Sequence, residues 1–225
     1  MMKVSGVVFD LDHTLFDRYA TFKALQTDFY TELKKYLSED ATPRDIYVSM
    51  VEGDKRFLYQ SWESLSKFVI SQDFFIEKIS EKDFIDIIFS CFSRKAVPYS
   101  FTLPMLEALK KRGFKLGLIT NGKSKLQRKK LSMLGLENSF DEILISEEFG
   151  ERKPNTSIFY EMSKRLSIPP CNLVYVGDHP INDIDAASKS GYKTVWVKTN
   201  GAWVEGCIKP SAEVMTVEEL PSLLD

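Results

Sequence analysis

Residues 4–15 read Val-Ser-Gly-Val-Val-Phe-Asp-Leu-Asp-His-Thr-Leu, an apolar run that ends in two aspartates. The run Val4–Phe9 is nearly continuous in hydrophobicity, which is typical of a strand buried on both faces of a parallel sheet. Residues i and i+2 of an extended chain point to the same side, so we expect the side chains of Asp10 and Asp12 to converge. Open α/β sheets bind ligands at the carboxyl ends of their strands. This stretch therefore predicts both the fold and the edge of the sheet that carries the site.

Further short apolar runs of the same kind follow along the chain, at Lys115–Ile119, Glu142–Ile145, Leu173–Val176 and Thr194–Val197. Helical patterns alternate with them, at Leu103–Arg112, Ser124–Leu134, Asn155–Leu166, Asn182–Ser190 and Val217–Leu224. We expect Thr102 to cap the first of these helices and Gly113 to follow it. Strand–helix alternation with short connections predicts right-handed βαβ units. The expected fold class is α/β, with a doubly wound, mainly parallel, Rossmann-like sheet.

Residues 17 to 95 break this alternation. Apolar side chains recur there at helical spacing, and helix starts are indicated at Thr42-Pro43 and at Ser80, which with Asp83 resembles a capping box. We therefore predict a helical insertion at 17–95, with 1–16 and 96–225 forming the α/β core. Such an insertion can serve as a lid that excludes water and selects the leaving group. Lys55 or Arg56 could bind a phosphorylated substrate, although a solvated turn explains them more simply. Phe57, Tyr59 and Trp62 could stack on a ring of the substrate, although ordinary packing explains them more simply.

The composition limits the classes of partner. The chain has 225 residues, 44% of them hydrophobic and 28% charged, with a formal net charge of −2. These values fit a sizeable core and argue against disorder. The near balance of charge gives no overall basic field, so nucleic acid is not an expected partner. No apolar run is long enough to span a bilayer, so we expect no membrane partner either. The sequence favours neither a monomer nor a homodimer.

The cysteines indicate the compartment. Cys91, Cys171 and Cys207 are too few and too widely spaced for a disulfide framework or a zinc site. We interpret them as reduced thiols of a cytoplasmic protein and expect Cys171 to be packed. The apolar run at the start lacks the pattern of a signal peptide, which supports the same location.

Asp10 and Asp12 suggest a metal site. Two carboxylates so close together repel each other unless they share a proton or a cation. A hard divalent cation with oxygen ligands, such as Mg²⁺, resolves that repulsion. The alternative is that the pair only caps a turn, because aspartate is common after a strand.

Two further motifs offer groups that bind an anion. Thr120, Asn121 and Gly122 follow a predicted strand, where the hydroxyl and the backbone amides can donate to an anion. Lys153 lies just before a predicted helix, where its charge would add to the helix N-terminus and hold a phosphate. The simpler alternatives are an N-cap with a turn for the first motif and a solvated loop lysine for the second.

The last motif supplies more carboxylates. Asp178 follows a predicted buried strand and can bind the same cation as Asp10, and Gly177 would allow close approach of the backbone to a ligand. Asp183 opens the next helix and can act through water or orient a ligand, or it can simply cap that helix. Each motif is weak alone, but all of them lie near the carboxyl ends of predicted parallel strands.

In this order along the chain, Asp10-Leu11-Asp12-His13-Thr14, Thr120, Lys153, and Gly177-Asp178 with Asp183 resemble the four motifs of the haloacid dehalogenase (HAD) superfamily. The resemblance implies that Asp10 is the nucleophile and that Asp12 is the general acid/base, which also gives a backbone carbonyl to Mg²⁺. It implies that Thr120 and Lys153 hold phosphoryl oxygens, that Asp178 binds the metal and that Asp183 supports it. His13 departs mildly from the family, which often has Asp, Asn or Gly there, and we assign it no catalytic role. The insertion resembles the cap of many members.

Asp12 narrows the reaction that the resemblance implies. A phosphatase needs an acid/base there, whereas the dehalogenase branch usually lacks one because halide leaves without a proton. We therefore expect a Mg²⁺-dependent phosphatase that acts on a small phosphorylated metabolite through an aspartyl-phosphate on Asp10. Residues 10–17 resemble those of nucleotidase-like members. A sugar phosphomutase on the same scaffold stays open. A non-enzymatic phosphoacceptor of the receiver type also stays open, although the insertion and the Gly177-Asp178 motif are unexpected in it.

Overall fold

The computed structural model describes residues 1–57, 61–198 and 201–225. These residues form two compact units. The first consists of Met1–Asp17 and Pro98–Asp225, and the second is Arg18–Val97. The second unit occupies the stretch of chain in which the helical insertion was expected. Tyr59, which was considered as a binding residue, lies outside the described residues.

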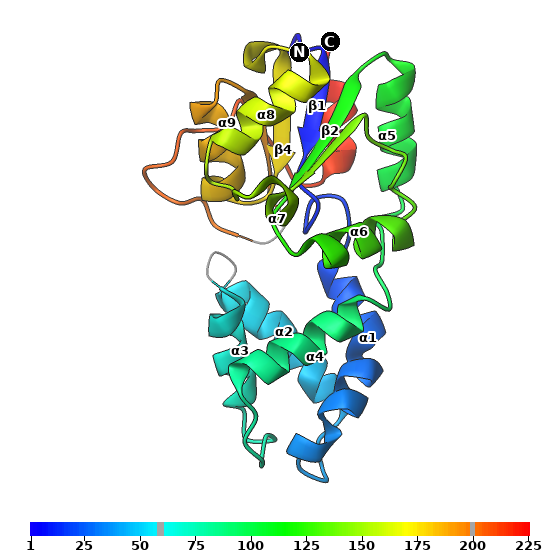
Figure 1. The fold of residues 1–225 in the computed structure, drawn as a ribbon, viewed down its shortest axis with the longest axis vertical. Coiled ribbons are helices and arrows are strands. Elements are labelled where there is room, and N and C mark those ends of the chain that lie inside the picture. Colours follow the sequence, from blue (N-terminus) through cyan, green and yellow to red (C-terminus); the bar gives the residue numbers. More distant parts are fainter. Residues whose placement is uncertain (58–60, 199–200) are drawn as a thin grey trace. The chain divides into compact units, whose positions relative to one another are not determined.

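The described part of the first unit contains a six-stranded sheet (Figure 1). Its strands in chain order are β1 (Gly6–Phe9), β2 (Lys115–Thr120), β3 (Glu142–Ile145), β4 (Leu173–Gly177), β5 (Lys193–Val197) and β6 (Ala212–Val214). Neighbouring strands all pair in parallel, in the order β3-β2-β1-β4-β5-β6. The direction of the strand order reverses between β1 and β4, and crevices at such switch points bind ligands in open α/β sheets. The predicted Rossmann-like fold class is confirmed.

Helices cover both faces of this sheet. They are α5 (Thr102–Lys111), α6 (Ser124–Met133), α7 (Ser146–Phe149), α8 (Ser157–Leu166) and α9 (Ala186–Lys189), with a π-helical turn at Pro180–Asp185 and 3₁₀ turns at Pro170–Asn172 and Val217–Leu223. Figure 1 shows α8 and α9 on one side of the sheet and α5 on the other. The two ends of the chain meet, because Met2 N donates to Leu223 O at 2.7 Å and Asp225 N donates to Met2 O at 3.1 Å.

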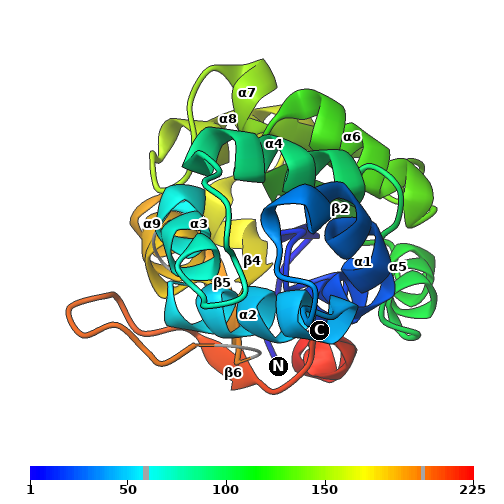
Figure 2. The same ribbon diagram turned by 90° about the horizontal axis from the view of Figure 1, so that it is seen from below.

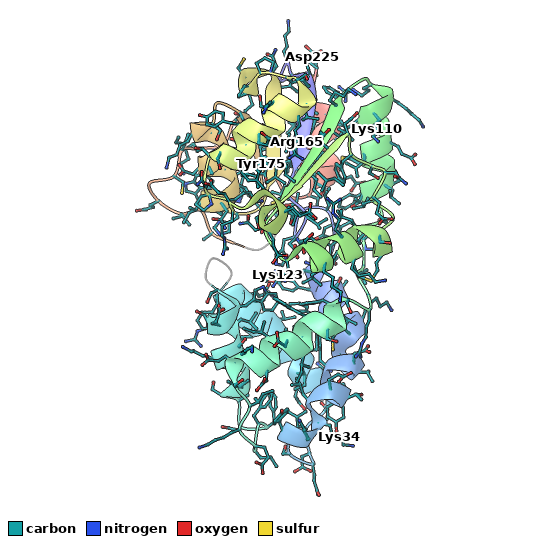
Figure 3. The ribbon with its side chains drawn as sticks, in the orientation of Figure 1. Lys34, Lys110, Lys123, Arg165, Tyr175 and Asp225 are labelled. Carbon is teal, nitrogen blue, oxygen red and sulfur yellow. The ribbon has the colours of Figure 1, made fainter. Side chains whose placement is uncertain are left out.

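The core lies between the sheet and these helices (Figure 3). Strands β1, β2, β4 and β5 are buried along almost their whole length, as the continuous apolar runs predicted. Tyr175 of β4 is fully buried and packs edge-on against Phe159 of α8, with ring centroids 5.1 Å apart. Its hydroxyl group reaches the site described below, so this residue joins the apolar core to the polar edge of the sheet.

Three sequence-based expectations need correction, and two short elements were not expected. Thr102 does not cap α5; it is the first residue of that helix, and its buried hydroxyl donates to Leu15 O at 2.7 Å, tying α5 to the loop after β1. Cys171 is exposed rather than packed, because it lies in the 3₁₀ turn before β4. The helix expected at 182–190 begins earlier, as the π-helical turn, and only its end is α-helical. The short elements β6 and α7 were not predicted, since three or four residues carry too little periodicity to be recognised.

The described part of the second unit contains four α-helices, α1 (Arg18–Leu33), α2 (Pro43–Arg56), α3 (Trp62–Ile70) and α4 (Glu81–Phe92). Each helix packs against the next, and α4 packs against α1, so the four form a closed ring (Figure 2). Thr42 and Asp45 form a capping box at the start of α2, and Ser80 caps α4 by accepting from Asp83 N at 3.0 Å. The expected helix starts at these two places are therefore confirmed.

The interior of the helical unit is mainly apolar. The rings of Phe22, Phe29 and Phe92 contact one another, with centroids 5.5 to 6.4 Å apart. One ion pair is also nearly buried there, between Arg18 Nη2 and Asp54 Oδ1 at 2.7 Å. The Arg18 guanidinium also lies over the ring of Trp62, 4.7 Å from the centroid. No helix in the described part of the chain combines the length and the apolar composition that a bilayer crossing requires.

Candidate active site

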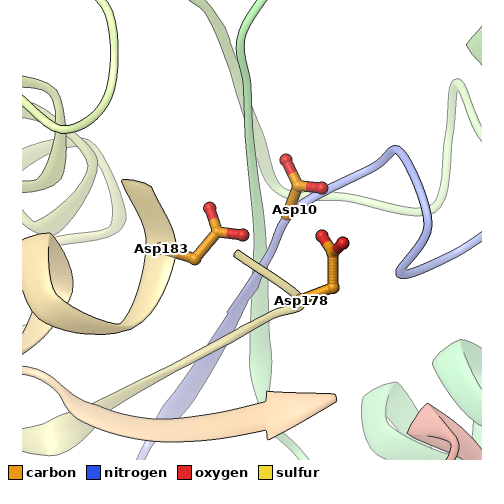
Figure 4. Close-up of side chains that lie close together, drawn as sticks. All are labelled: Asp10, Asp178 and Asp183. Atoms are coloured by element: carbon orange, nitrogen blue, oxygen red, sulfur yellow. The ribbon is translucent and has the colours of Figure 1, made fainter. Parts of the chain in front are cut away.

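Three aspartates meet at the carboxyl end of the central strands. Phe9 of β1 is level with Val176 of β4, and Asp10 N donates to Val176 O at 2.9 Å, so the residues that follow the two strands emerge together. Among the described residues, Asp10, Asp178 and Asp183 form a group in which one carboxylate oxygen from each lies within 4.8 Å of the others. Figure 4 shows their three side chains close together.

Asp183 reaches this group because residue 177 is a glycine. An ideal Cβ on Gly177 would lie 2.4 Å from Asp183 Oδ2 and 2.6 Å from Asp183 Cγ, which is closer than real Cβ contacts occur. The Asp183 carboxylate therefore occupies the space that any other side chain at position 177 would fill. Its Oδ2 accepts from His179 N at 3.0 Å, and the His179 ring accepts from Ile181 N and Asn182 N at 3.2 Å each. The turn before α9 is thus held at both ends.

Lys153 lies among these carboxylates and is only 2% exposed. Its Nζ donates to Asp10 Oδ1 at 2.7 Å, to Asp183 Oδ1 at 2.6 Å and to the Tyr175 hydroxyl at 2.8 Å. An ammonium group has three hydrogens, so these contacts use all of them. The simpler alternative, a solvated loop lysine, is wrong for this residue.

Burial and crowding disfavour the charged forms of these acids. Burial raises the pKa of Asp10 to about 7; Lys153 acts against this effect, while the Asp183 and Asp12 carboxylates add to it. Burial, followed by the Asp183 and Asp10 charges, also raises the pKa of Asp178 well above its ordinary value. Burial alone would lower the pKa of Lys153, but the nearby Asp10 and Asp183 carboxylates outweigh it and raise the pKa. The two carboxylates therefore favour the charged form of Lys153.

The donor set fits a hard divalent cation. If all three carboxylates are ionised, the one ammonium balances one of their charges and leaves two uncompensated. Buried carboxylates without a counter-charge either take up protons or coordinate a metal. Oxygen donors of this kind suit Mg²⁺. Asp10 and Asp178, with Asp183 beside them, are the residues that would hold it.

The residues expected to bind phosphate lie next to this group. Thr120, at the end of β2, is buried, and its hydroxyl accepts from Gln127 Nε2, so its own hydrogen can be donated elsewhere. Asn121 instead holds the lysine loop: its Nδ2 donates to Lys153 O at 3.0 Å, and its Oδ1 accepts from Lys153 N at 2.9 Å. Gly122 N donates to Ser146 Oγ at 3.0 Å. The sequence, which suggested that this amide donates to an anion, did not indicate the contact with Ser146.

Asp12 has a different environment from Asp10. Both of its carboxylate oxygens accept from Lys130 Nζ, at 2.7 and 3.0 Å, and Oδ2 also accepts from Gln127 Nε2 at 3.1 Å. Its side chain is 23% exposed. The expectation that Asp10 and Asp12 share a cation through both side chains does not match this arrangement, in which the Asp12 carboxylate is paired with a lysine. The backbone carbonyl that the family resemblance assigns to the metal is a separate group.

Sequence reasoning missed Gln127, Lys130 and Tyr175. Gln127 and Lys130 lie three positions apart, on one face of α6. The leucines around them predict a helix packed against the core, and that pattern does not mark a polar contact. The apolar run around Tyr175 predicts a buried strand but gives no indication that its hydroxyl contacts Lys153. A polar residue in the middle of a predicted buried face is the signal that would have marked all three.

His13 is explained by its backbone. It is buried and has a φ of 62°, in the left-handed region, where Asn, Asp and His are the common non-glycine residues. This fits the variation expected at the position among relatives, because Asp, Asn and Gly also adopt this backbone conformation.

The comparison with protein families decides the classification. The model described as haloacid dehalogenase-like hydrolase matches residues 7–197. The chain belongs to this family. The family resemblance noted from the sequence is thereby confirmed, and the matched range includes every residue of the site described above.

Curated relatives are phosphatases. The chain is 44% identical over 101 residues to glyceraldehyde 3-phosphate phosphatase of Methanopyrus kandleri, an alignment that covers 45% of this chain and 43% of the relative. It is 28% identical over 236 residues to pyrimidine 5'-nucleotidase YjjG of Escherichia coli, with 99% of each chain covered. The alignment spans less than half the length of the first of these relatives.

A solved structure shows the same fold. The HAD-hydrolase YfnB from Bacillus subtilis, in a structure described as bound to magnesium, aligns with a TM-score of 0.79 over 98% of each chain at 21% identity. Likeness at this identity supports the fold alone, which agrees with the topology of the sheet.

Proposed function

We propose that the chain is a Mg²⁺-dependent phosphatase that hydrolyses a small phosphate monoester through an aspartyl-phosphate on Asp10. The observation that supports this most is the position of Asp10: buried, hydrogen-bonded to Lys153, and grouped with the carboxylates of Asp178 and Asp183. A carboxylate in such a site can act as a nucleophile when the charge around it is balanced.

The metal belongs to the proposal. Asp10 and Asp178 would bind it through their carboxylates, Asp12 through its backbone carbonyl, and Asp183 would support it. When bound, a divalent cation neutralises negative charge on the phosphoryl oxygens and on the acidic side chains. The relatives named as a glyceraldehyde 3-phosphate phosphatase and a pyrimidine 5'-nucleotidase support the hydrolysis of a phosphate monoester.

In the first step, an Asp10 carboxylate oxygen attacks phosphorus in line with the ester oxygen. The bond from phosphorus to the ester oxygen breaks as the bond to Asp10 forms. Asp12 gives its proton to the departing alkoxide, which leaves as an alcohol. The Thr120 hydroxyl donates to a phosphoryl oxygen. As Asp10 bonds to phosphorus, Lys153 turns the hydrogen that it donated to Asp10 toward another phosphoryl oxygen, so both groups stabilise the charge that builds there.

In the second step, a water molecule attacks phosphorus of the aspartyl-phosphate. Asp12, now a carboxylate, takes a proton from that water. The bond between phosphorus and the Asp10 oxygen breaks, which regenerates the carboxylate and releases inorganic phosphate. Splitting the hydrolysis in this way replaces one difficult displacement by two easier ones.

The substrate is expected to be a small phosphorylated metabolite. The relative aligned over its full length is named as a pyrimidine 5'-nucleotidase, which favours a nucleoside monophosphate. The relatives named as glyceraldehyde 3-phosphate phosphatase match a smaller part of the chain. We assign the helical unit, Arg18–Val97, the part of a cap that selects the leaving group. A cytoplasmic location also belongs to this proposal, which the dispersed free cysteines support.

The test is phosphate release from a panel of monoesters in the presence of Mg²⁺. The panel includes pyrimidine and purine nucleoside monophosphates, triose phosphates and hexose phosphates. We expect turnover of at least one class, and its disappearance in Asp10→Asn. Turnover that survives in Asp10→Asn would contradict the proposal.

The same panel separates the alternatives. Interconversion of hexose phosphates without phosphate release would identify a phosphomutase. Stable labelling of the protein by a small phosphodonor, without turnover, would identify a phosphoacceptor.

A further inference from the structure

Helix α6 presents two buried polar side chains to Asp12. Lys130 Nζ contacts both carboxylate oxygens, at 2.7 and 3.0 Å, and Gln127 Nε2 contacts Oδ2 at 3.1 Å. Lys130 is only 8% exposed and Gln127 only 1%. A lysine that is almost fully buried and paired in this way is uncommon, because long charged side chains ordinarily remain in solvent.

The same amide joins two parts of the site. Gln127 Nε2 also donates to the Thr120 hydroxyl at 2.5 Å, so one side chain contacts both the residue expected to hold the phosphoryl group and the residue expected to move the proton. Gly122 gives it room: a Cβ there would lie 3.0 Å from both Cγ and Cδ of Gln127. The Lys130 ammonium also lies over the Phe16 ring, 5.3 Å from its centroid, which fixes its other side.

Fold stability alone does not require this arrangement. Burying an ion pair is expensive because both charges lose water, and well-packed apolar side chains often do as well or better at such positions. A pair that is retained next to reacting groups is better explained by the geometry that it imposes. An acid/base must lie within hydrogen-bond reach of the atom that it protonates.

We propose that Lys130 and Gln127 are positioning residues for Asp12, fixing the direction of its carboxyl group for proton transfer. They act through Asp12 and do not themselves contact the reacting atoms. The Asp12 side chain has two rotatable bonds, and contacts to both of its oxygens restrict both of them. The inference rests on the proposed phosphatase activity, and it adds two residues that the sequence motifs do not contain.

The test uses the dependence of rate on the leaving group. An alkyl phosphate needs a proton on its leaving oxygen, whereas 2,4-dinitrophenyl phosphate releases a stable anion without one. The quantity measured is kcat/KM for each ester, and the ratio of the two within one preparation. A reduced fraction of folded protein lowers both values equally, so it cancels from the ratio.

In Lys130→Met we expect kcat/KM for the alkyl ester to fall about 10- to 100-fold, a part of what a general acid contributes. For the dinitrophenyl ester we expect a fall of less than about 3-fold. Gln127→Leu should change the ratio in the same direction, with an additional loss on both esters because it also contacts Thr120.

Three further variants control the experiment. Lys129→Met removes a neighbouring exposed lysine of the same helix and should leave the ratio unchanged. Lys130→Arg keeps a donor that can reach both oxygens and should restore most of the activity on the alkyl ester. Adding Lys130→Met to Asp12→Asn should not change the ratio further, because residues that act as a unit are not additive.

Equal losses on both esters in Lys130→Met, or no loss, would overturn the inference while leaving the phosphatase proposal intact. An unchanged ratio in Asp12→Asn would also overturn it, since there would be no acid to position. Failure of the wild-type protein to hydrolyse either ester would instead reject the proposed function itself.

Discussion

The two units bury charge in different ways. In the sheet unit, the carboxylates of Asp10, Asp178 and Asp183 lie together, and the Lys153 ammonium contacts two of them, Asp10 and Asp183. In the helical unit, Arg18 and Asp54 form a matched pair inside an otherwise aromatic and aliphatic interior. A matched pair can be satisfied by the protein alone, whereas an excess of one sign calls for something from solution.

The two groups of charges also lie at different kinds of place in the fold. The excess of carboxylates lies where β1 and β4 end, at the switch point of the sheet, which is where ligands bind in folds of this class. The pair in the helical unit connects α1 to α2. Removing a carboxylate from the group in the sheet unit should therefore lower activity without lowering stability. Removing the carboxylate of the pair in the helical unit should lower stability.

The largest effect is expected for Asp10→Asn. Loss of the nucleophile should lower kcat by about 10³-fold or more. Because the substitution removes one of three crowded carboxylates, the apo protein should unfold at the same or a higher temperature than the wild type. Phosphate-release assays and thermal denaturation in chelator measure the two quantities. A large fall in the unfolding temperature would show that Asp10 is needed for the fold.

Asp54→Asn in the helical unit should behave in the reverse way. It leaves Arg18 nearly buried without its carboxylate partner, which should lower the free energy of unfolding by about 3 kcal/mol. The double variant Arg18→Met/Asp54→Leu should recover most of that stability, because neither charge then remains. Denaturant unfolding measures both. An Asp54→Asn variant as stable as the wild type would contradict the proposed difference between the two units.

A divalent cation should stabilise the sheet unit. At Mg²⁺ concentrations about 100 times the dissociation constant, binding adds about 2.7 kcal/mol. For a chain of this length, that corresponds to a rise of about 5 to 10 °C in Tm. Asp178→Asn should remove most of the rise, whereas Asp54→Asn should leave it unchanged even though its starting Tm is lower. Differential scanning fluorimetry with and without Mg²⁺ gives the comparison, and an equal rise in Asp178→Asn would contradict it.

The sequence anticipated much of the sheet unit for identifiable reasons. Continuous apolar runs marked β1, β2, β3, β4 and β5, because strands buried on both faces carry no alternation. Asp10, Thr120 and Asp178 could be found because each lies at the end of such a run, and Lys153 because it precedes a predicted helix. The exact partners of Lys153 could not be found, since Tyr175 and Asp183 meet it only through the folding of distant segments.

The partners of the α6 side chains lay outside what a pattern can show. A glutamine and a lysine on the predicted buried face of a helix indicate that polar groups meet there, but not which residue they contact. Only the tertiary structure places Gln127 and Lys130 beside Asp12, more than a hundred residues away in the chain. The helical unit offered still less, because amphipathic spacing predicts helices and their caps but not the Arg18–Asp54 pair.

The smallest effect is expected from two glycine substitutions, one in each unit. Gly177→Ala places a methyl group where the Asp183 carboxylate lies, so Asp183 must move, and activity should fall about 10- to 100-fold. Gly53→Ala in α2 puts a methyl group 3.0 Å from the movable ring of Phe68, so activity should remain and stability should change by less than about 1 kcal/mol. Kinetics and denaturant unfolding of both variants test this. Equal effects on activity would contradict the account.

The claim on which the rest depends is that Asp10 and Asp178 bind one divalent cation together. A crystal structure of the wild-type protein grown with Mn²⁺ tests it most directly, because the anomalous signal locates the ion independently of the protein atoms. We expect a single strong peak in direct contact with carboxylate oxygens of both Asp10 and Asp178. A crystal in which Mn²⁺ binds elsewhere on the molecule, while Lys153 alone occupies the space between the three carboxylates, would contradict it.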